Sequence, residues 1–168
     1  MNTQEKWSFL HDNVRSQSIS VIVMAFNERD YLEIVVREIA SVLHELKRAY
    51  EIIIVDDGSS DGTEKIADRL AEELPMVRAI HHATNQGLGA AYRTGFVQAQ
   101  GDLVTFFPAD GQFPATIMQQ FVPLITNADM VLGYLPNRHS SLLAKVLSKV
   151  EKIIYRVLFG PLPKFQGC

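Results

Sequence analysis

Apolar runs and apolar positions at helical spacing alternate along the chain. Short, almost continuous apolar runs rich in β-branched residues are typical of strands covered on both faces. They predict strands at residues 19–26, 51–55, 77–81 and 103–107, with a short fifth strand at 130–133. Helical periodicity predicts a helix after each of these strands: one from about residue 31 to 46, then 63–74, 88–100, 114–125 and 142–159.

Turn and cap residues mark the boundaries of these elements. Asn27 and Asp30 are candidate caps of the first helix, and Gly101 is the expected C-cap of the helix at 88–100. Pro114 is placed to open the next helix. Strands that alternate with helices predict an α/β fold of the Rossmann-like kind, with a mostly parallel sheet and helices on both faces. We expect residues 1–17 to form a polar tail and residues 18–168 to form the domain.

The composition of the chain limits the classes of partner that we expect it to bind. The chain has 168 residues, of which 47% are hydrophobic, so it can bury the core of one domain. Its net charge of −3 gives no general reason to bind nucleic acid. The only cysteine, Cys168, has no partner for an intrachain disulfide, and the tail lacks the apolar core of a secretion signal. A cytoplasmic setting is therefore expected.

Polar residues directly follow three of the predicted strands. In open parallel sheets ligands sit outside the carboxyl ends of the strands. The segments Phe26-Asn27-Glu28, Asp56-Asp57 and Asp110-Gly111-Gln112 should therefore converge on one edge. Carboxylate and amide oxygens are ligands that Mg²⁺ and Mn²⁺ accept, so Asp110 and Gln112 are candidates for holding a cation that bridges a diphosphate.

Each of these motifs also has a purely structural interpretation. Asp57 and Asp61 suit caps of the turn and of the next helix, and Asp110 suits a turn before a proline. Gly87 opens a helix where backbone N–H groups can face an anion, but close backbone packing explains a glycine there equally well. From the residues alone these alternatives stay open.

Two further features are interpreted structurally. His81 and His82 lack a metal-ligand neighbour at suitable spacing and point to opposite sides of a strand, so we expect them to be structural or exposed. The predicted helix at 142–159 carries a broad apolar face beside a cationic stripe. Core packing is favoured for it, and contact with an anionic membrane surface is the alternative. The stripe comprises Lys145, Lys149, Lys152 and Arg156.

Taken together and in order, the segments resemble the family 2 glycosyltransferases. SVIVMAFNE is similar to the first strand and nucleotide loop of that family, and EIIIVDDGSSDGT to its second strand and signature turn. NQGLGAAYRTGF is similar to its glycine-bearing helix start, and PADGQ stands at its metal site. Within the family, the chain resembles the branch of dolichol-phosphate mannose synthase and other polyprenyl-phosphate glycosyltransferases.

The resemblance implies the GT-A fold, an activity and a set of site residues. Such enzymes transfer a sugar from a nucleotide donor, here a UDP- or GDP-sugar, to a polyprenyl phosphate or a glycan acceptor at a membrane, usually with inversion and with Mg²⁺ or Mn²⁺. A place in cell envelope glycan synthesis, at the inner face of the membrane, follows from it. The implied nucleotide-sugar site comprises Ala25, Phe26, Glu28, Asp56, Asp57, Gly87 and Arg138, and Asp110 with Gln112 is implied at the metal, Asp110 also being catalytic.

The sequence departs from the family pattern in three places. Pro108 replaces the first acid of an Asp-Ala-Asp triplet, and Leu135 stands where a second basic residue is common. The chain ends at Cys168, where the family continues, so we expect a truncated domain. An impaired nucleotide-binding module without turnover is the alternative function. A nicotinamide-dependent oxidoreductase is a third interpretation, but it lacks the glycine fingerprint, whose third glycine falls at Tyr92.

Overall fold

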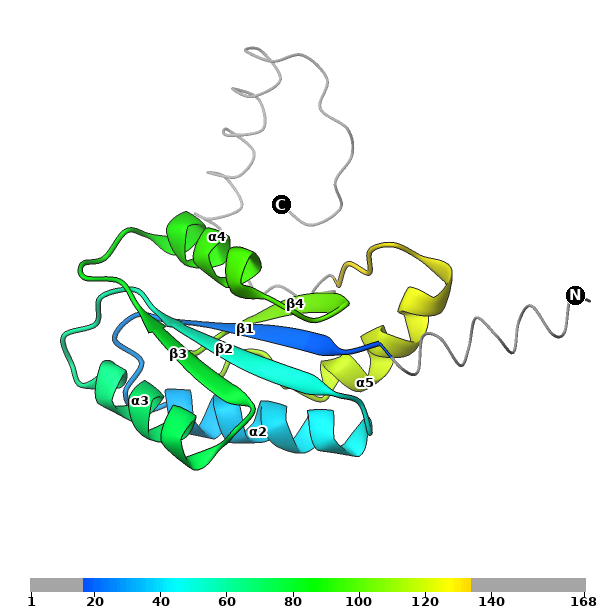
Figure 1. The fold of residues 1–168 in the computed structure, drawn as a ribbon, viewed down its shortest axis with the longest axis horizontal. Coiled ribbons are helices and arrows are strands. Elements are labelled where there is room, and N and C mark those ends of the chain that lie inside the picture. Colours follow the sequence, from blue (N-terminus) through cyan, green and yellow to red (C-terminus); the bar gives the residue numbers. More distant parts are fainter. Residues whose placement is uncertain (1–16, 134–168) are drawn as a thin grey trace, which may run out of the picture. The chain divides into compact units, whose positions relative to one another are not determined.

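A parallel four-stranded sheet forms the centre of the structure, a computed structural model that describes residues 17–133 (Figure 1). The strands lie in the order β3-β2-β1-β4. The sheet and its helices belong to the first of two units into which the chain divides, Met1–Asp129. In chain order the elements are β1 Ile19–Ala25, α2 Leu32–Glu45, β2 Tyr50–Asp56, α3 Thr63–Glu73, β3 Val77–His81, α4 Leu88–Gln98, β4 Leu103–Pro108, α5 Ile117–Phe121 and the 3-10 helix η1 Val122–Asn127.

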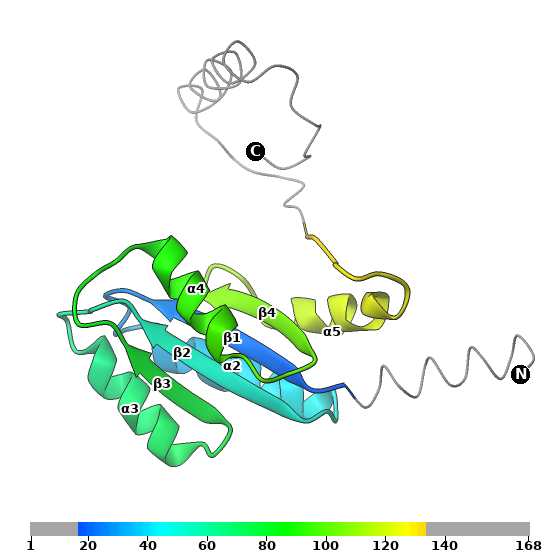
Figure 2. The same ribbon diagram turned by 45° about the horizontal axis from the view of Figure 1, so that its top comes forward.

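Different helices cover the two faces of the sheet, α2 and α3 one face and α4 the other (Figures 1 and 2). Side chains alternate between the faces along each strand. Val23 and Ile54 therefore enter the larger core with α2, α3 and α5, whereas Ile22 and Val55 enter the smaller core against α4. The predicted α/β fold, with a parallel sheet between helices, is confirmed.

β1 is the centre of this arrangement because it is buried along its whole length. All seven residues of β1 are buried, and it pairs with β2 on one side and with β4 on the other. Burial of a large aliphatic side chain contributes about 1.5–3 kcal/mol, so an apolar strand gains most between two covered faces. The continuous apolar run in the sequence is the direct cause of this central position.

Two element predictions at the C-terminal side are wrong. Residues 130–133 form no strand, and Met130 and Leu132 are 70% and 74% exposed. Local apolar character favours a strand, but the strand also needs a neighbouring backbone with which to pair. The helix predicted at 114–125 is instead a short α5 that continues as the 3-10 helix η1.

The predicted caps are wrong as well. α2 begins after Tyr31 without a side-chain cap, because the Asn27 amide oxygen accepts the Ser60 N–H at 2.9 Å instead. α4 ends at Gln98, before Gly101. The backbone N–H of Gly101 donates to Ser20 Oγ at 2.7 Å, and a Cβ at this position would lie 2.6 Å from Ser20 N. Close approach to β1, and not a helix end, therefore requires this glycine.

Several predictions lie outside the described residues. The helix at 142–159 with its cationic stripe, Arg138, Leu135 and nearly all of the polar tail fall there. Across residues 17–133 the structure contains no helix that is both long and apolar enough to cross a bilayer.

A glycine pair in α4 tests how closely this helix packs on β1. A Cβ at Gly95 would lie 2.3 Å from Ile22 Cγ2, whereas a Cβ at Gly89 would meet nothing within 4 Å. Gly95→Ala should therefore overpack the smaller core and lower the free energy of unfolding by about 1–3 kcal/mol. Gly89→Ala, the matched control, should be neutral or stabilising by up to about 1 kcal/mol. Urea unfolding of both variants measures the difference, and equal stability would contradict the packing.

Candidate functional site

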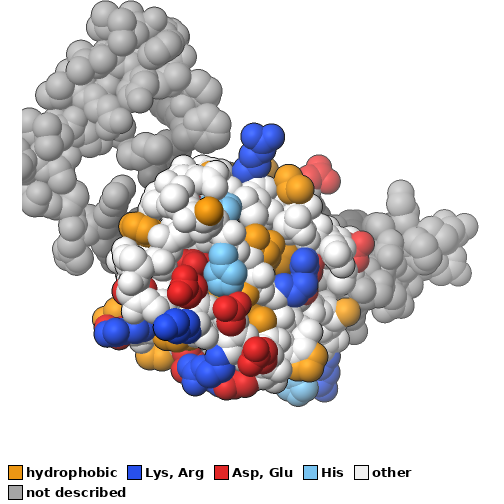
Figure 3. Space-filling model, turned by 60° about the vertical axis from the view of Figure 1, so that its left-hand side comes forward, with side chains coloured by type: hydrophobic (Ala, Val, Ile, Leu, Met, Phe, Trp, Pro, Cys, Tyr) orange, Lys and Arg blue, Asp and Glu red, His pale blue; other side chains and the backbone are white. Residues whose placement is uncertain are grey.

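The carboxyl ends of the strands meet at one edge of the sheet because the strands are parallel and in close register. Ala25 pairs with Asp56, Asp56 pairs with His81, and Met24 pairs with Pro108. The face of the molecule at this edge shows acidic side chains gathered around histidine (Figure 3). The loops that leave the strands here build the candidate site.

A cavity of about 260 Å³ opens among these loops. It draws on the ends of β1, β2 and β4 and on the start of α4. Six of the predicted site residues line it: Ala25, Phe26, Glu28, Asp57, Gly87 and Asp110. The remaining lining residues are Met24, Asn85, Leu88, Ala91, Pro108 and Ala109. Segments far apart in the sequence thus converge as the strand-end argument predicts.

The buried carboxylate of Asp57 holds the loop that precedes α4. It accepts hydrogen bonds from Gln86 N–H at 2.9 Å, from Gly87 N–H at 2.8 Å and from His82 Nδ1 at 2.6 Å. Burial by itself would raise the pKa of Asp57, but these three donors outweigh it and hold the pKa below its ordinary value. Asp57 is therefore an ionised anchor for the loop.

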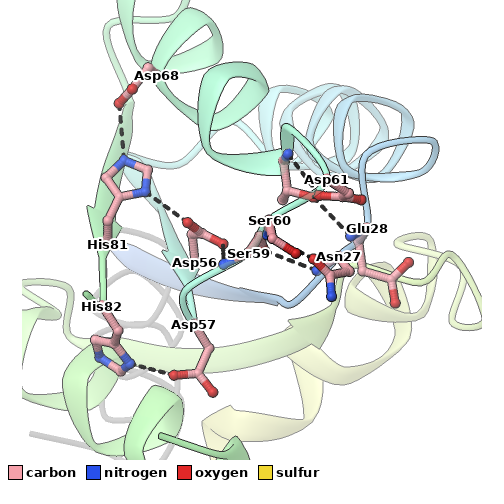
Figure 4. A network of polar contacts seen from close by, with 11 residues as sticks. Asn27, Glu28, Asp56, Asp57, Ser59, Ser60, Asp61, Asp68, His81 and His82 are labelled. Carbon is pink, nitrogen blue, oxygen red and sulfur yellow. Dashed lines mark hydrogen bonds and ion pairs between the residues drawn. The ribbon is translucent and has the colours of Figure 1, made fainter. Parts of the chain in front are cut away.

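His82 extends this anchor to α4. Its Nε2 lies 2.8 Å from Thr94 Oγ1, while its Nδ1 faces Asp57, so one imidazole joins the ends of β2 and β3 to the helix (Figure 4 shows the Asp57 contact). The loop approaches β2 closely as well. A Cβ at Gly58, whose φ is +71°, would lie 2.5 Å from the backbone carbon of Thr84. Only glycine combines this conformation with this approach.

Asp56 is held on the opposite side of the same strand end (Figure 4). It is 1% exposed, and its Oδ1 accepts the Ser59 N–H at 3.2 Å. Its Oδ2 lies 3.0 Å from His81 Nδ1, and His81 Nε2 lies 3.0 Å from Asp68 Oδ1 on α3. Asp56 does not line the cavity. The structure therefore places the two neighbouring acids in different surroundings.

The loop after β1 is tied to the loop after β2 by four side-chain hydrogen bonds. Backbone N–H groups of residues 27, 28 and 29 donate to Ser59 Oγ, Thr63 Oγ1 and Asp61 Oδ2, and Ser60 N–H donates to Asn27 Oδ1. Asn27 itself has a φ of +55°, a conformation that asparagine tolerates better than most residues. These bonds fix Phe26 and Glu28 at the rim of the cavity.

Two carboxylates, those of Glu28 and Asp110, line this cavity. Burial, the negative charge of Asp110 and that of Asp61 together raise the pKa of Glu28. Asp110 Oδ1 accepts the Gln112 N–H at 3.0 Å, and Gly111 between them has a φ of +70°. The Asp-Gly-Gln segment is therefore a tight turn that presents the Asp110 carboxylate to the cavity.

The oxygen atoms that line the cavity are suitable ligands for a hard cation such as Mg²⁺. No group of three or more His, Cys, Asp or Glu ligands occurs among residues 17–133. Mg²⁺ is usually held by one or two carboxylates together with phosphate oxygens and waters, and not by an all-protein cage. Asp110, with Glu28 nearby, supplies oxygen ligands of that number. Burial is the first cause of the raised pKa of Glu28, and the negative charges of Asp110 and Asp61 add to it; a cation would offset those charges.

Pro108 fits the end of β4 without breaking the sheet. Leu103 and Ala109 donate their backbone N–H groups to Ser18 and Met24 of the β1 segment. In a parallel pair, alternate residues bond to the same neighbour, so residue 108 turns its backbone nitrogen away from β1. A proline costs no hydrogen bond there. It lines the cavity but brings no charge into it.

Not every predicted site residue reaches the cavity. The side chain of Gln112 is exposed and does not line it. Gly87 lines it, but its N–H already donates to Asp57 and to Asn85 Oδ1. Asp61 accepts Thr63 N–H at 3.0 Å, but the N-cap of α3 is Gly62, and no side-chain hydrogen bond caps this helix. His81 and His82, expected to be structural or exposed, have a structural role, because they hold the two acids. The strand register Asp56↔His81 was the signal that could have found them.

Comparison with known proteins places the chain in a family. A sequence model of glycosyl transferase family 2 matches residues 20–160. An uncharacterized glycosyltransferase of Nostoc is 38% identical over 114 residues, covering 67% of this chain and 34% of the relative. The undecaprenyl-phosphate 4-deoxy-4-formamido-L-arabinose transferase of Salmonella choleraesuis is 28% identical over 161 residues, covering 95% of this chain and 49% of the relative. The chain belongs to glycosyl transferase family 2.

Solved structures show the same fold. A mannosyltransferase of Pyrobaculum calidifontis in complex with GDP-Man and Mn²⁺ matches with a TM-score of 0.59 at 24% identity, over 67% of this chain and 33% of that one. Glucosyl-3-phosphoglycerate synthase of Mycobacterium tuberculosis matches with a TM-score of 0.62 at 24% identity, over 92% and 58%. The expected GT-A fold is confirmed. The chain spans half or less of the length of the curated relatives cited above.

The position of His81 between two acids should make stability depend on pH. Burial lowers the pKa of His81, but hydrogen bonds with Asp56 and Asp68 outweigh it and raise the pKa above the ordinary 6.5. The folded state therefore binds this proton more tightly than the unfolded state does. Its contribution to stability is complete below the unfolded-state pKa and is lost as pH rises through the folded-state pKa.

Urea unfolding of wild type and His81→Asn from about pH 5 to about pH 9 measures this contribution. The difference in stability between the two proteins should shrink as pH rises. Asp68→Asn should reduce the pH dependence because it removes one of the two negative charges that raise the pKa of His81. A difference that is constant over the whole pH range would contradict the assignment.

Proposed function

We propose that this domain binds a nucleotide-sugar donor at the strand-end cavity and serves sugar transfer to a polyprenyl phosphate or a related membrane-associated acceptor. The observation that carries the proposal is the convergence of Phe26, Glu28, Asp57, Gly87 and Asp110 on one cavity in a family 2 chain. The Salmonella choleraesuis relative named as an undecaprenyl-phosphate transferase supports the acceptor class. The complexes of neighbours with GDP-Man and UDP-GlcNAc support the donor class.

The residues around the cavity suggest which part of the nucleotide-sugar donor each of them contacts. Phe26 is 45% exposed at the rim and offers a ring against which a nucleobase can pack. Ala25 and Gly87 are small and let a ligand approach the backbone. The start of α4, where Gly87 and Leu88 line the cavity, favours an anionic diphosphate through the helix dipole. Asp56 does not line the cavity and contributes indirectly, because it holds the loop after β2 through the Ser59 N–H.

Asp110 is the residue proposed to hold the cation, with Gln112 retained as a predicted second ligand. A bound Mg²⁺ or Mn²⁺ would neutralise the charge that develops on the departing nucleoside diphosphate. Asp110 contributes by placing a fixed carboxylate at the end of β4, held in its turn by the Gln112 N–H. A phosphate acceptor is already anionic, so it needs little help from a general base. Direct displacement by such an acceptor inverts the anomeric centre.

A binding module without turnover is the second candidate function. Pro108 supports it, because it leaves the cavity without the charge that an acid at this position would bring. In that case the same cavity binds a nucleotide and a cation weakly. The two candidates differ in transfer, and not in the location of the site.

Binding of a nucleoside diphosphate should depend on a divalent cation and on Asp110. Calorimetry with UDP and GDP, with and without Mn²⁺, should show tighter binding when the metal is present. Asp110→Ala should weaken that binding by about tenfold or more, since even outer-sphere changes at metal sites cost at least tenfold. Asp30→Ala is the matched control, because Asp30 is exposed and does not line the cavity. Equal affinities with and without metal, in wild type and Asp110→Ala alike, would contradict the proposal.

Restoring an acid at position 108 should strengthen the cation site. Pro108→Asp adds a charged oxygen ligand to the cavity without breaking a bond to β1, and cation affinity in oxygen sites rises with ligand charge and number. A Mn²⁺ titration at saturating nucleoside diphosphate should show tighter binding than wild type, and Pro108→Ala is the control for loss of the proline alone. If a folded Pro108→Asp variant binds Mn²⁺ no better than Pro108→Ala, the cation does not bind at this turn.

A further inference from the structure

His81 has an arrangement that the proposed chemistry leaves unexplained. Its ring lies between two carboxylates that belong to different elements, Asp56 of β2 and Asp68 of α3, each 3.0 Å from one ring nitrogen (Figure 4). The two acids differ in exposure, since the Asp56 side chain is 2% exposed and that of Asp68 is 62% exposed. One side of the imidazole therefore faces the interior and the other faces solvent.

The hydrogen bonds among His81, Asp56 and Asp68 favour one protonation state of the imidazole. An ionised carboxylate only accepts hydrogen bonds, so each ring nitrogen must donate to satisfy its partner. A neutral imidazole has one N–H, whereas an imidazolium has two. The imidazolium therefore fits this geometry, and its charge compensates the nearly inaccessible Asp56 carboxylate. An uncompensated charge at that depth would be strongly unfavourable.

A continuous chain of hydrogen bonds leads from His81 to the cavity. His81 holds Asp56 Oδ2, and Asp56 Oδ1 accepts the Ser59 N–H at 3.2 Å. Ser59 Oγ in turn accepts the Asn27 N–H at 2.9 Å. Asn27 lies between Phe26 and Glu28, both of which line the cavity. Each link fixes the orientation of the next group, because a rotated carboxylate would release the Ser59 N–H.

We propose that His81 is a positioning residue of the donor site, which acts through Asp56 and Ser59 to hold the segment Phe26–Glu28 in its ligand-binding conformation. The proposal rests on the proposed function, because it assumes that the cavity binds the nucleoside part of the donor. It differs from a purely structural role in its consequence. A general loss of stability would weaken every ligand of the cavity alike, whereas displacement of residues 26–28 weakens only ligands that touch this rim.

The experiment compares two probes on the full 168-residue chain. Calorimetry measures the affinity for a nucleoside diphosphate, UDP or GDP, and for inorganic diphosphate, both with Mn²⁺. His81→Phe keeps a ring but donates no hydrogen bond to Asp56, so it should weaken nucleoside diphosphate binding by about tenfold, the effect of a lost hydrogen bond to a charged group. Inorganic diphosphate binding should weaken clearly less, since Asp110 and the start of α4 keep their positions and only Glu28 moves.

Two further variants follow the path of the effect. Ser59→Ala removes the acceptor of the Asn27 N–H, so the double variant with His81→Phe should lose no more affinity than the larger single loss. Such non-additivity is expected when two residues act through one chain of contacts. His81→Leu, which also lacks a donor for Asp56, tests the proposal if His81→Phe does not fold. Arg69→Gln, on the same helix as Asp68, is the control for a surface charge change and should leave both affinities unchanged.

The outcomes separate this inference from the proposed function. If wild type binds neither UDP nor GDP with Mn²⁺, the proposed function fails and the inference fails with it. If wild type binds them and the folded His81 variants bind as tightly, the proposed function stands and the positioning role is wrong. Equal losses for both probes, or additive losses in the double variant, would also overturn the positioning role.

Discussion

The backbone ladder that β2 shares with β1 and β3 sets the position of the two acid–histidine pairs at the strand ends. The ladder continues past the strands, because Asp57 N–H donates to Ala25 O and His82 N–H donates to Asp56 O, both at 2.9 Å. Alternation along the strands then sends Asp56 and His81 toward α3, and Asp57 and His82 toward α4. The same alternation that separates the two hydrophobic cores therefore separates two acid–histidine pairs, one on each face.

Charge explains why these pairs exist and why the cavity suits an anionic ligand with a cation. Buried acids are tolerated when they are hydrogen-bonded, and Asp57 obtains three donors from a single loop. The pKa of Glu28 instead rises, first through burial and then through repulsion from the charge of Asp110. A divalent cation would remove this repulsion and attract a diphosphate at once. Local electrostatics thus agree with family membership, although the net charge of the chain is negative.

The sequence predicted the sheet and its edge well, because both depend on local patterns. The β-branched runs located all four strands of the described part, and parallel order implied that Phe26, Asp57 and Asp110 would meet. The predictions were wrong or incomplete where contacts with a second segment of the chain decide the role of a residue. The Asn27 side chain caps no helix because it bonds across to Ser60, and the roles of His81 and His82 depend on the register between β2 and β3. Asp56 was predicted to contact the nucleotide and Gln112 the cation, but neither residue lines the cavity in the structure. Their binding roles stay predictions.

The central claim is that a nucleoside diphosphate and a divalent cation share the cavity at the strand ends. Paramagnetic Mn²⁺ broadens the NMR signals of nearby amides, so a spectrum of the labelled chain with UDP or GDP maps the cation directly. Broadening should appear only with nucleotide present and should centre on Gly111, Ala109 and Leu88. Broadening centred instead on Asp30 and Asp61, which line a second hollow that shares only Glu28 with the cavity, would contradict the claim, as would broadening that does not depend on the nucleotide.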